Sequence, residues 1–161
     1  MNTKFSKLLS LGLQKEFKGE LKGVFQDYMG LNWSVVDYET DNSGKYHDEY
    51  TGKRLVSGRE IVSINQQSYI RQYAGGTVDS KTLSALKLND GDVIGFLVKV
   101  ISNNAEKTRL DAEYNYEEED WKYNYSILDK IDSLSLINGK EEIIFKGVVV
   151  FVHIFTITPI E

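Results

Sequence analysis

The feature that most constrains the fold is a hairpin-like pattern that occurs twice in the chain. Both copies consist of two runs of β-branched and aromatic residues around a short polar or glycine-containing break, which is typical of a β-hairpin. The same interval of 82 residues separates Glu60 from Glu142 and Tyr73 from Phe155. We therefore predict two related sheet-forming halves, built around SGREIVSINQQSYIRQYAGG (57–76) and NGKEEIIFKGVVVFVHIF (138–155).

Helical spacing of apolar residues occurs near the N-terminus and again in the middle of the chain. The first helix is expected to be capped by Thr3, to stop at Gly19, and to bury Phe5, Leu8, Leu9, Leu13 and Phe17. Asp79 is expected to cap a short second helix that carries Leu83 and Leu86. Asn89 or Asp90 is expected to cap a third, ended by Asn103-Asn104, with Val93, Phe96, Leu97, Val100 and Ile101 on its apolar face.

Further strands are expected at residues 32–38, 45–50, 121–127 and around 134–137, with a turn at Asp41-Asn42-Ser43-Gly44. Residues 21–28 fit either a short helix or a strand, and residues 104–120 a loop with some strand near Tyr114 and Tyr116. The sequence therefore predicts an α+β fold, with largely antiparallel sheet from two related β-meander halves, an N-terminal helix and a central helix. We expect a single compact domain over 1–161, with halves at about 20–78 and 105–158 joined by the helical segment 80–103.

Composition excludes several classes of function. The net charge of −5 argues against a broad groove for the nucleic-acid backbone, because such grooves need clustered Lys and Arg. The chain has no cysteine, which excludes disulfides and thiolate chemistry and is compatible with the cytoplasm. The longest apolar run, Val148–Ile160, is too short for a membrane helix and reads as a buried strand, and the first 13 residues lack the apolar core of a signal peptide.

Motifs for catalysis or for metal binding are weak. His47 and Glu49 could share one strand face, but a metal site needs three or four convergent ligands. His153 lies among apolar residues and is expected to pack in the core. The sequence contains no G-x-S-x-G and no phosphate-binding glycine motif, so we expect no cofactor and no metal, and we favour a non-enzymatic function.

Glu60 and Glu142 form the most interesting carboxylate pair. If a twofold axis relates the two hairpins, these side chains occupy equivalent places and could act as paired acid and base. The alternative, which we favour, is that each carboxylate only accepts hydrogen bonds at the start of a strand, from a turn or from a basic neighbour such as Arg71.

An acidic and aromatic segment is the first candidate for a binding surface. Aromatic side chains supply contact area and carboxylates steer a basic partner, although such segments are more often solvated loops. The candidate partner surface comprises Asp111, Glu113, Tyr114, Tyr116, Glu117, Glu118, Glu119, Asp120 and Trp121.

A cleft between the two half-sheets is the second candidate. Aromatic side chains would line it and charged groups would orient a small molecule, although ordinary core packing is the simpler explanation of these aromatics. The candidate cleft comprises Trp33, Tyr46, Tyr50, Glu60, Tyr69, Arg71, Tyr73 and Glu142.

The chain resembles an uncharacterised bacterial family of the domain-of-unknown-function type. The resemblance rests on Tyr50, Gly52, Gly58, Glu60, Val62, Tyr73 and Gly75, and on Gly139, Glu141, Glu142, Ile143, Lys146 and Gly147. Its members carry the duplicated hairpins and occur alone or attached to helix-turn-helix regulators, which implies bacterial or phage origin but no established activity. This chain departs from the pattern where Asn65-Gln66-Gln67 and Thr156-Ile157-Thr158 replace an Asn-Gly-Lys-like turn and a Gly-Gly end.

Two functions follow as expectations. The leading one is a binding or regulatory module that acts through protein contacts, such as an inhibitor of a nucleic-acid-binding or defence protein. The alternative is a small-molecule-sensing domain. We expect a protein partner and no membrane, and a dimer could form through an edge strand at Trp33–Tyr38 or Val148–Phe155.

Overall fold

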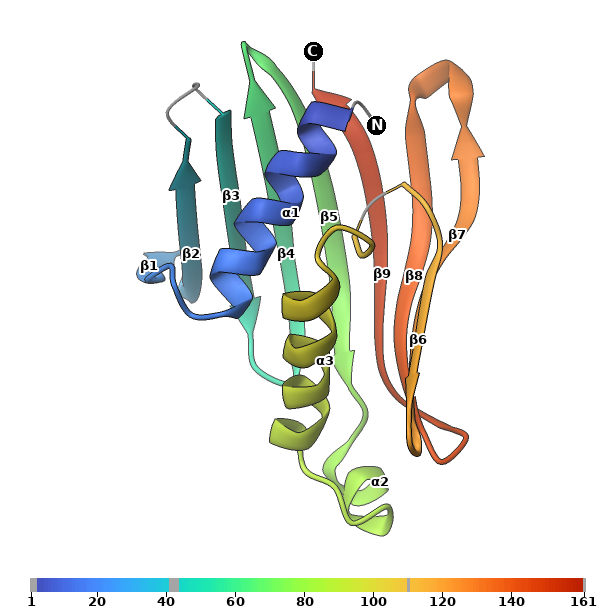
Figure 1. Ribbon diagram of the computed structural model, residues 1–161. Helices are drawn as coiled ribbons and strands as arrows, with labels where there is room; N and C mark the ends of the chain where they lie inside the picture. The colour runs from blue at the N-terminus through green and yellow to red at the C-terminus, as the bar shows by residue number, and fades with distance from the viewer. Residues whose placement is uncertain (1–2, 41–43, 110, 161) are drawn as a thin grey trace.

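Nine antiparallel strands form one sheet, and helices α1 and α3 lie across one of its faces (Figure 1). The computed structural model describes residues 3–40, 44–109 and 111–160. The strand order is β1-β2-β3-β4-β5-β9-β8-β7-β6, so the last strand lies in the middle of the sheet. This arrangement confirms the predicted antiparallel α+β class.

The elements follow one another through short connections. The helices are α1 (Thr3–Phe17), α2 (Ser80–Ala85), α3 (Asp90–Asn104) and the 3-10 turn η1 (Asp132–Leu134). The strands are β1 (Val24–Tyr28), β2 (Leu31–Glu39), β3 (Gly44–Gly52), β4 (Leu55–Ile64), β5 (Gln67–Thr77), β6 (Tyr114–Glu118), β7 (Trp121–Ile131), β8 (Leu136–Phe145) and β9 (Val148–Ile160).

Helix α1 packs on the sheet and on α3 through the apolar face that its spacing predicts. Phe5, Leu8, Leu9 and Leu13 are buried. Gly12 brings the helix backbone against Tyr46 of β3, because an added Cβ would lie 2.2 Å from the Cγ atom of that ring. The predicted cap at Thr3 concerns a side chain outside the described residues.

Helix α3 begins as predicted. The Asn89 side chain accepts a hydrogen bond from the Asp92 backbone at 3.2 Å, and the Asp92 carboxylate accepts one from the Asn89 backbone at 2.8 Å. This reciprocal pair is a capping box, which satisfies two amide groups that the first turn leaves free. The predicted apolar face is buried in full, and α3 ends at Asn104.

The two hairpins bury corresponding residues in corresponding register. In the first, Gly58 lies opposite Tyr73 and Glu60 opposite Arg71. In the second, Gly139 lies opposite Phe155 and Glu141 opposite His153. An added Cβ would lie 2.6 Å from the Tyr73 hydroxyl at Gly58 and 2.1 Å from Phe155 Cζ at Gly139, so each glycine makes room for the ring opposite.

The residue that corresponds to Glu60 is therefore Glu141, not Glu142. The register of β8 and β9 shifts between Ile143, opposite Phe151, and Ile144, opposite Val149. The bulge at Val150 lengthens the second hairpin by one residue. A single sequence offset therefore cannot align both strands of the first hairpin with both strands of the second. Side chains alternate along a strand, and Glu142 consequently faces the opposite side of the sheet.

Several other expectations need comment. Val148–Phe155 is not an edge strand, because β9 lies between β5 and β8. Of the other predicted edge, β1 pairs with Trp33–Val35 but not with residues 36–38. The outermost strands are β1 and β6. Residues 24–28 are a strand rather than a helix. The turn predicted at 41–44 falls mainly on positions 41–43, outside the described residues.

Candidate functional site

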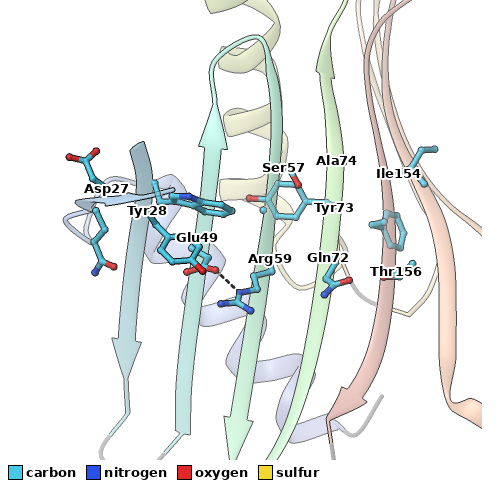
Figure 2. Close-up of a pocket in the computed structure, with 14 residues that line it drawn as sticks. Asp27, Tyr28, Glu49, Ser57, Arg59, Gln72, Tyr73, Ala74, Ile154 and Thr156 are labelled. Atoms are coloured by element: carbon cyan, nitrogen blue, oxygen red, sulfur yellow. Dashed lines mark ion pairs between the residues drawn. The ribbon is translucent and has the colours of Figure 1, made fainter. Parts of the chain in front are cut away.

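Two hollows flank the centre of the sheet, one on each face. The first, of about 900 Å³, lies on the face that the helices leave open. Figure 2 shows it between Asp27 and Tyr28 on one side and Gln72 and Thr156 on the other, with Arg59 paired to Glu49 across neighbouring strands.

This open hollow is a poor candidate for a specific site. Most side chains that line it are exposed, among them Tyr28, Arg59, Gln72 and Ile154. Its main charged groups are already paired with each other in water. Exposed ion pairs of this kind contribute little energy and need no ligand.

The second hollow, of about 650 Å³, lies between the sheet and the two long helices. Its volume falls in the range of pockets that hold small organic molecules. The walls are mainly apolar and come from α1, β1–β5, α3 and β9: Phe17, Leu21, Phe25, Val36, Tyr50, Val56, Ile94, Leu97, Val98 and Phe151. Its polar groups are Glu16, Ser34, Asp48, Lys53, Arg54, Tyr73, Arg109 and His153. We call this hollow the inner cavity.

Four buried charges connect the two halves beside the inner cavity. Arg109 donates to Glu60 at 2.7 Å and lies 3.5 Å from Glu141. Arg71 donates to Glu141 at 3.2 Å and lies 3.5 Å from Glu60. All four side chains are at least 96% buried, and two guanidinium groups balance two carboxylates. We call these residues the charge tetrad.

The tetrad strongly favours the ionised form of Glu141. Burial alone would raise the pKa of Glu141, but Arg109, a hydrogen bond with His153 and then Arg71 lower it well below its usual value. Tyr123 also donates to Glu141 at 2.7 Å. Losing a single member would leave an uncompensated buried charge, which is costly.

A second pair of carboxyl groups lies at the cavity, with no ion-paired cation among the residues described. Glu16 of α1 accepts a hydrogen bond from Tyr46, and Asp48 of β3 accepts one from Tyr73 at 3.2 Å. Glu16 and Asp48 also hydrogen-bond to each other. We call them the acid pair.

The acid pair holds protons more tightly than free carboxyl groups do. Burial raises the pKa of Asp48 well above its usual value, and the negative charges of Glu16 and Glu60 raise it further. Burial also raises the pKa of Glu16, although hydrogen bonds with Tyr46 and Asp48 oppose the shift. Perturbed carboxyl groups in a cavity are a common mark of binding and catalytic sites.

His153 completes the inner cavity from β9. Its Nδ1 atom lies 3.4 Å from Glu141, and burial lowers the pKa of the ring. The side chain is 95% buried, and its Nε2 atom has no hydrogen-bond partner among the described residues. A buried polar atom of this kind needs a partner.

The structure gathers most, but not all, of the cleft residues predicted from the sequence. Strand pairing puts one group on the helix-covered face: Tyr46, Tyr50, Glu60, Tyr69, Arg71 and Tyr73. Of these, Tyr50 and Tyr73 line the inner cavity. Trp33 lies opposite Thr51 and lines the open hollow, and Glu142 also faces away from the helices. The two therefore cannot line a common cleft with the others.

Sequence reasoning did not assign Glu16, Asp48 or Arg109 of the inner cavity to a site, and it assigned His153 to core packing alone. Asp48 carried a usable signal, because it alternates with Tyr46 and Tyr50 on an otherwise aromatic strand face. Arg109 carried none, since it lies in the irregular segment between α3 and β6.

The predicted partner surface forms the β6–β7 edge of the sheet. Its aromatic side chains pack inward, with Trp121 stacked on Phe96 at 4.9 Å and 4.5 Å from Phe145 between ring centroids. Three of its carboxylates already contact lysines, namely Glu117 with Lys122, Glu118 with Lys99, and Asp120 with Lys146. Among the described residues, no group of His, Asp and Glu could hold a metal ion, and no helix could span a membrane.

Comparison with known protein families matches residues 48–157 to the family described as domain of unknown function (DUF5680). The match covers both hairpins and most of the inner cavity. No curated protein matches the chain. No solved structure matches it either.

Proposed function

Because the chain belongs to the family described as domain of unknown function (DUF5680), we propose its function from its own geometry: the domain binds a small organic molecule in the inner cavity. This is the sensing function that the sequence offered as an alternative. The inner cavity differs from the predicted cleft in its residues, because the helices rather than the two half-sheets enclose it.

One observation carries the proposal. An apolar cavity leads to the acid pair and to His153, polar groups that packing alone would not place there. Burying a carboxyl group or an unpartnered imidazole nitrogen destabilises a fold. A bound molecule would offset that cost by supplying the missing partners and by filling the space.

Binding of the fluorophore N-phenyl-1-naphthylamine tests the proposal, because it brightens in apolar surroundings and carries no charge. We expect saturable binding to the wild-type protein. Ile94→Trp should weaken it at least tenfold by filling the cavity, since Ile94 lines the inner cavity and is 41% exposed. Leu134→Trp is the matched control, because Leu134 is 61% exposed in η1, away from the cavity. Equal binding by all three proteins, or none by any, would refute the proposal.

Binding of a protein partner is a second proposal. Its support is the acidic character of residues 111–121 at an edge of the sheet. The inward packing of Tyr116 and Trp121 against Phe96 leaves mainly carboxylates for a partner to contact. A salt-dependent association rate with a basic partner would support it.

We also propose that the two halves are copies of one unit, a helix followed by antiparallel strands, with five strands in the first half and four in the second. The matching registers of Gly58–Tyr73 and Gly139–Phe155 support this duplication. Cytoplasmic location, bacterial or phage origin and attachment to helix-turn-helix segments are proposals that rest on the sequence and the family resemblance.

A further inference from the structure

We propose that the ligand of the inner cavity is a protonated amine on an apolar body, whose ammonium group binds at the acid pair and displaces a proton to water. This inference rests on the proposed small-molecule function and names the class of ligand.

The charges around the inner cavity favour a cation. The charge tetrad is balanced within itself, because Arg71 and Arg109 each contact both Glu60 and Glu141. The acid pair adds two carboxyl groups that form no ion pair with a cation in the part of the chain that the structure describes. A monocation that enters while one proton leaves keeps the charge of the site constant. The buried region therefore does not acquire a net charge, which would be costly.

His153 supports an ammonium group that carries N–H donors. Its Nδ1 atom faces the ionised Glu141, so the neutral ring holds its proton there and presents a lone pair at Nε2. Among the described residues, Nε2 is one of the buried atoms of the cavity-lining side chains that have no hydrogen-bond partner; Nδ1 and Arg109 Nε also make no hydrogen bond, but both lie within 3.5 Å of Glu141. His153 and Asp48 both contact Tyr73, through ring packing at 5.1 Å and through the hydroxyl. The acceptor and the acid pair therefore flank one side chain.

Charged and polar groups from several elements surround the acid pair. Glu16 comes from α1, Tyr46 and Asp48 from β3, Glu60 from β4, Tyr73 from β5 and Arg109 from the segment after α3. Burial and the mutual repulsion of the three carboxylates raise the pKa of Asp48, and only Arg109 opposes them among these groups. Arg109 is already engaged by Glu60 and Glu141, so the pair retains protons for a cation to replace.

An anionic ligand is the main competitor, because Lys53 and Arg54 also line the inner cavity. Both side chains are exposed at its rim. Arg54 donates to the Thr77 carbonyl oxygen at 2.9 Å. An anion that entered would therefore face the acid pair, whereas a cation whose ammonium group lies at the acid pair leaves only its apolar part beside the cations of the rim.

Three ligands with one aromatic body separate these cases: 1-naphthylmethylammonium, neutral 1-naphthalenemethanol and anionic 1-naphthoate. Each competes with N-phenyl-1-naphthylamine for the wild-type protein. We expect the cation to bind at least tenfold more tightly than the alcohol and the carboxylate to bind most weakly. A quaternary analogue, trimethyl(1-naphthylmethyl)ammonium, should lose most of this preference because it offers no N–H to His153 Nε2.

The proton exchange has its own readout. As pH rises, the dissociation constant of the ammonium ligand should fall by up to about tenfold per pH unit. This holds as long as the free acid pair still carries a proton and the amine stays protonated. Asp48→Asn should flatten this dependence and reduce the preference for the cation, because an amide cannot release a proton. Glu142→Gln is the matched control and should behave as wild type, since Glu142 lies on the other face of β8.

The possible outcomes distinguish a failure of the proposed ligand class from a failure of the proposed small-molecule function. If the fluorophore binds but the alcohol competes as well as the ammonium, the ligand class is wrong and the small-molecule function stands. Tightest binding of the carboxylate would show that the rim cations dominate and would overturn the inference. If the fluorophore fails to bind at all, the proposed function itself fails.

Discussion

Tyr73 of β5 lies directly opposite Phe155 of β9, where the two halves of the sheet meet. Arg71 lies over both rings, 5.1 Å from the centroid of Tyr73 and 4.7 Å from that of Phe155. From this junction the Tyr73 hydroxyl reaches the acid pair at Asp48, and Arg71 reaches the charge tetrad. The same pair of strands therefore joins the halves and supports the floor of the inner cavity.

The pH dependence of stability should report the acid pair. Burial raises the folded-state pKa of Asp48 and Glu16, so the folded protein binds more protons than the unfolded chain between the two pKa values. Stability from these groups is fully present below the unfolded pKa and falls as pH rises through the folded pKa. Asp48→Asn should make the fall of Tm with rising pH less steep above the unfolded-state pKa of a carboxyl group, which is about 4. A mutant curve parallel to wild type would contradict the assignment.

Breaking the charge tetrad should be costly. Arg71→Met removes one of two cations shared by Glu60 and Glu141, and should lower the free energy of unfolding by about 3 to 5 kcal/mol. Denaturation by urea measures the loss. Adding Glu141→Gln should recover part of it, because the second change removes the unbalanced charge. Strictly additive losses would show that the two residues act independently.

Gly139 should not tolerate a side chain. An added Cβ would lie 2.1 Å from Phe155 Cζ, so Gly139→Ala should cost about 1 to 3 kcal/mol by overpacking. Gly95→Ala is the matched control, because Gly95 lies in α3 with nothing within 4 Å of an added Cβ. That control should be stabilising by about 0.5 to 1 kcal/mol. A neutral Gly139→Ala would refute the close packing of ring and strand.

Trp121 tests whether the predicted partner surface is packing or interface. The ring stacks on Phe96 and packs at a tilt against Phe145, so Trp121→Ala should destabilise the protein by about 2 kcal/mol. Glu119→Gln on the same hairpin is the control and should leave Tm unchanged, because Glu119 is exposed. If Trp121→Ala left Tm unchanged but abolished binding to a protein partner, the result would favour the protein-partner function over small-molecule binding in the inner cavity.

Local sequence patterns were enough to predict most of the helices and strands. Helical spacing identified the buried face of α3, and Asn89 with Asp92 marked its start. The repeated runs identified β4, β5, β8 and β9. The order of the strands in the sheet could not be predicted in the same way. Alternation of apolar and polar residues shows which side chains share a face of a strand, but not which strand lies beside it. The closing strand was therefore mistaken for an edge.

The candidate site was harder to predict because a single inserted residue changes which face a carboxylate occupies. The bulge at Val150 made Glu142 seem equivalent to Glu60, whereas Glu141 is the buried one. The inner cavity also depends on contacts between distant segments. Glu16, Asp48, Arg109 and His153 come together only after α1, β3, β9 and the segment after α3 have packed.

A crystal structure of the protein with N-phenyl-1-naphthylamine tests the central claim most directly. We predict that the aromatic rings lie in the inner cavity, among Phe17, Leu97 and Phe151, with Asp48 and His153 at its polar end. Rings bound instead in the open hollow beside Trp33, with the space beneath the helices unfilled, would contradict the account.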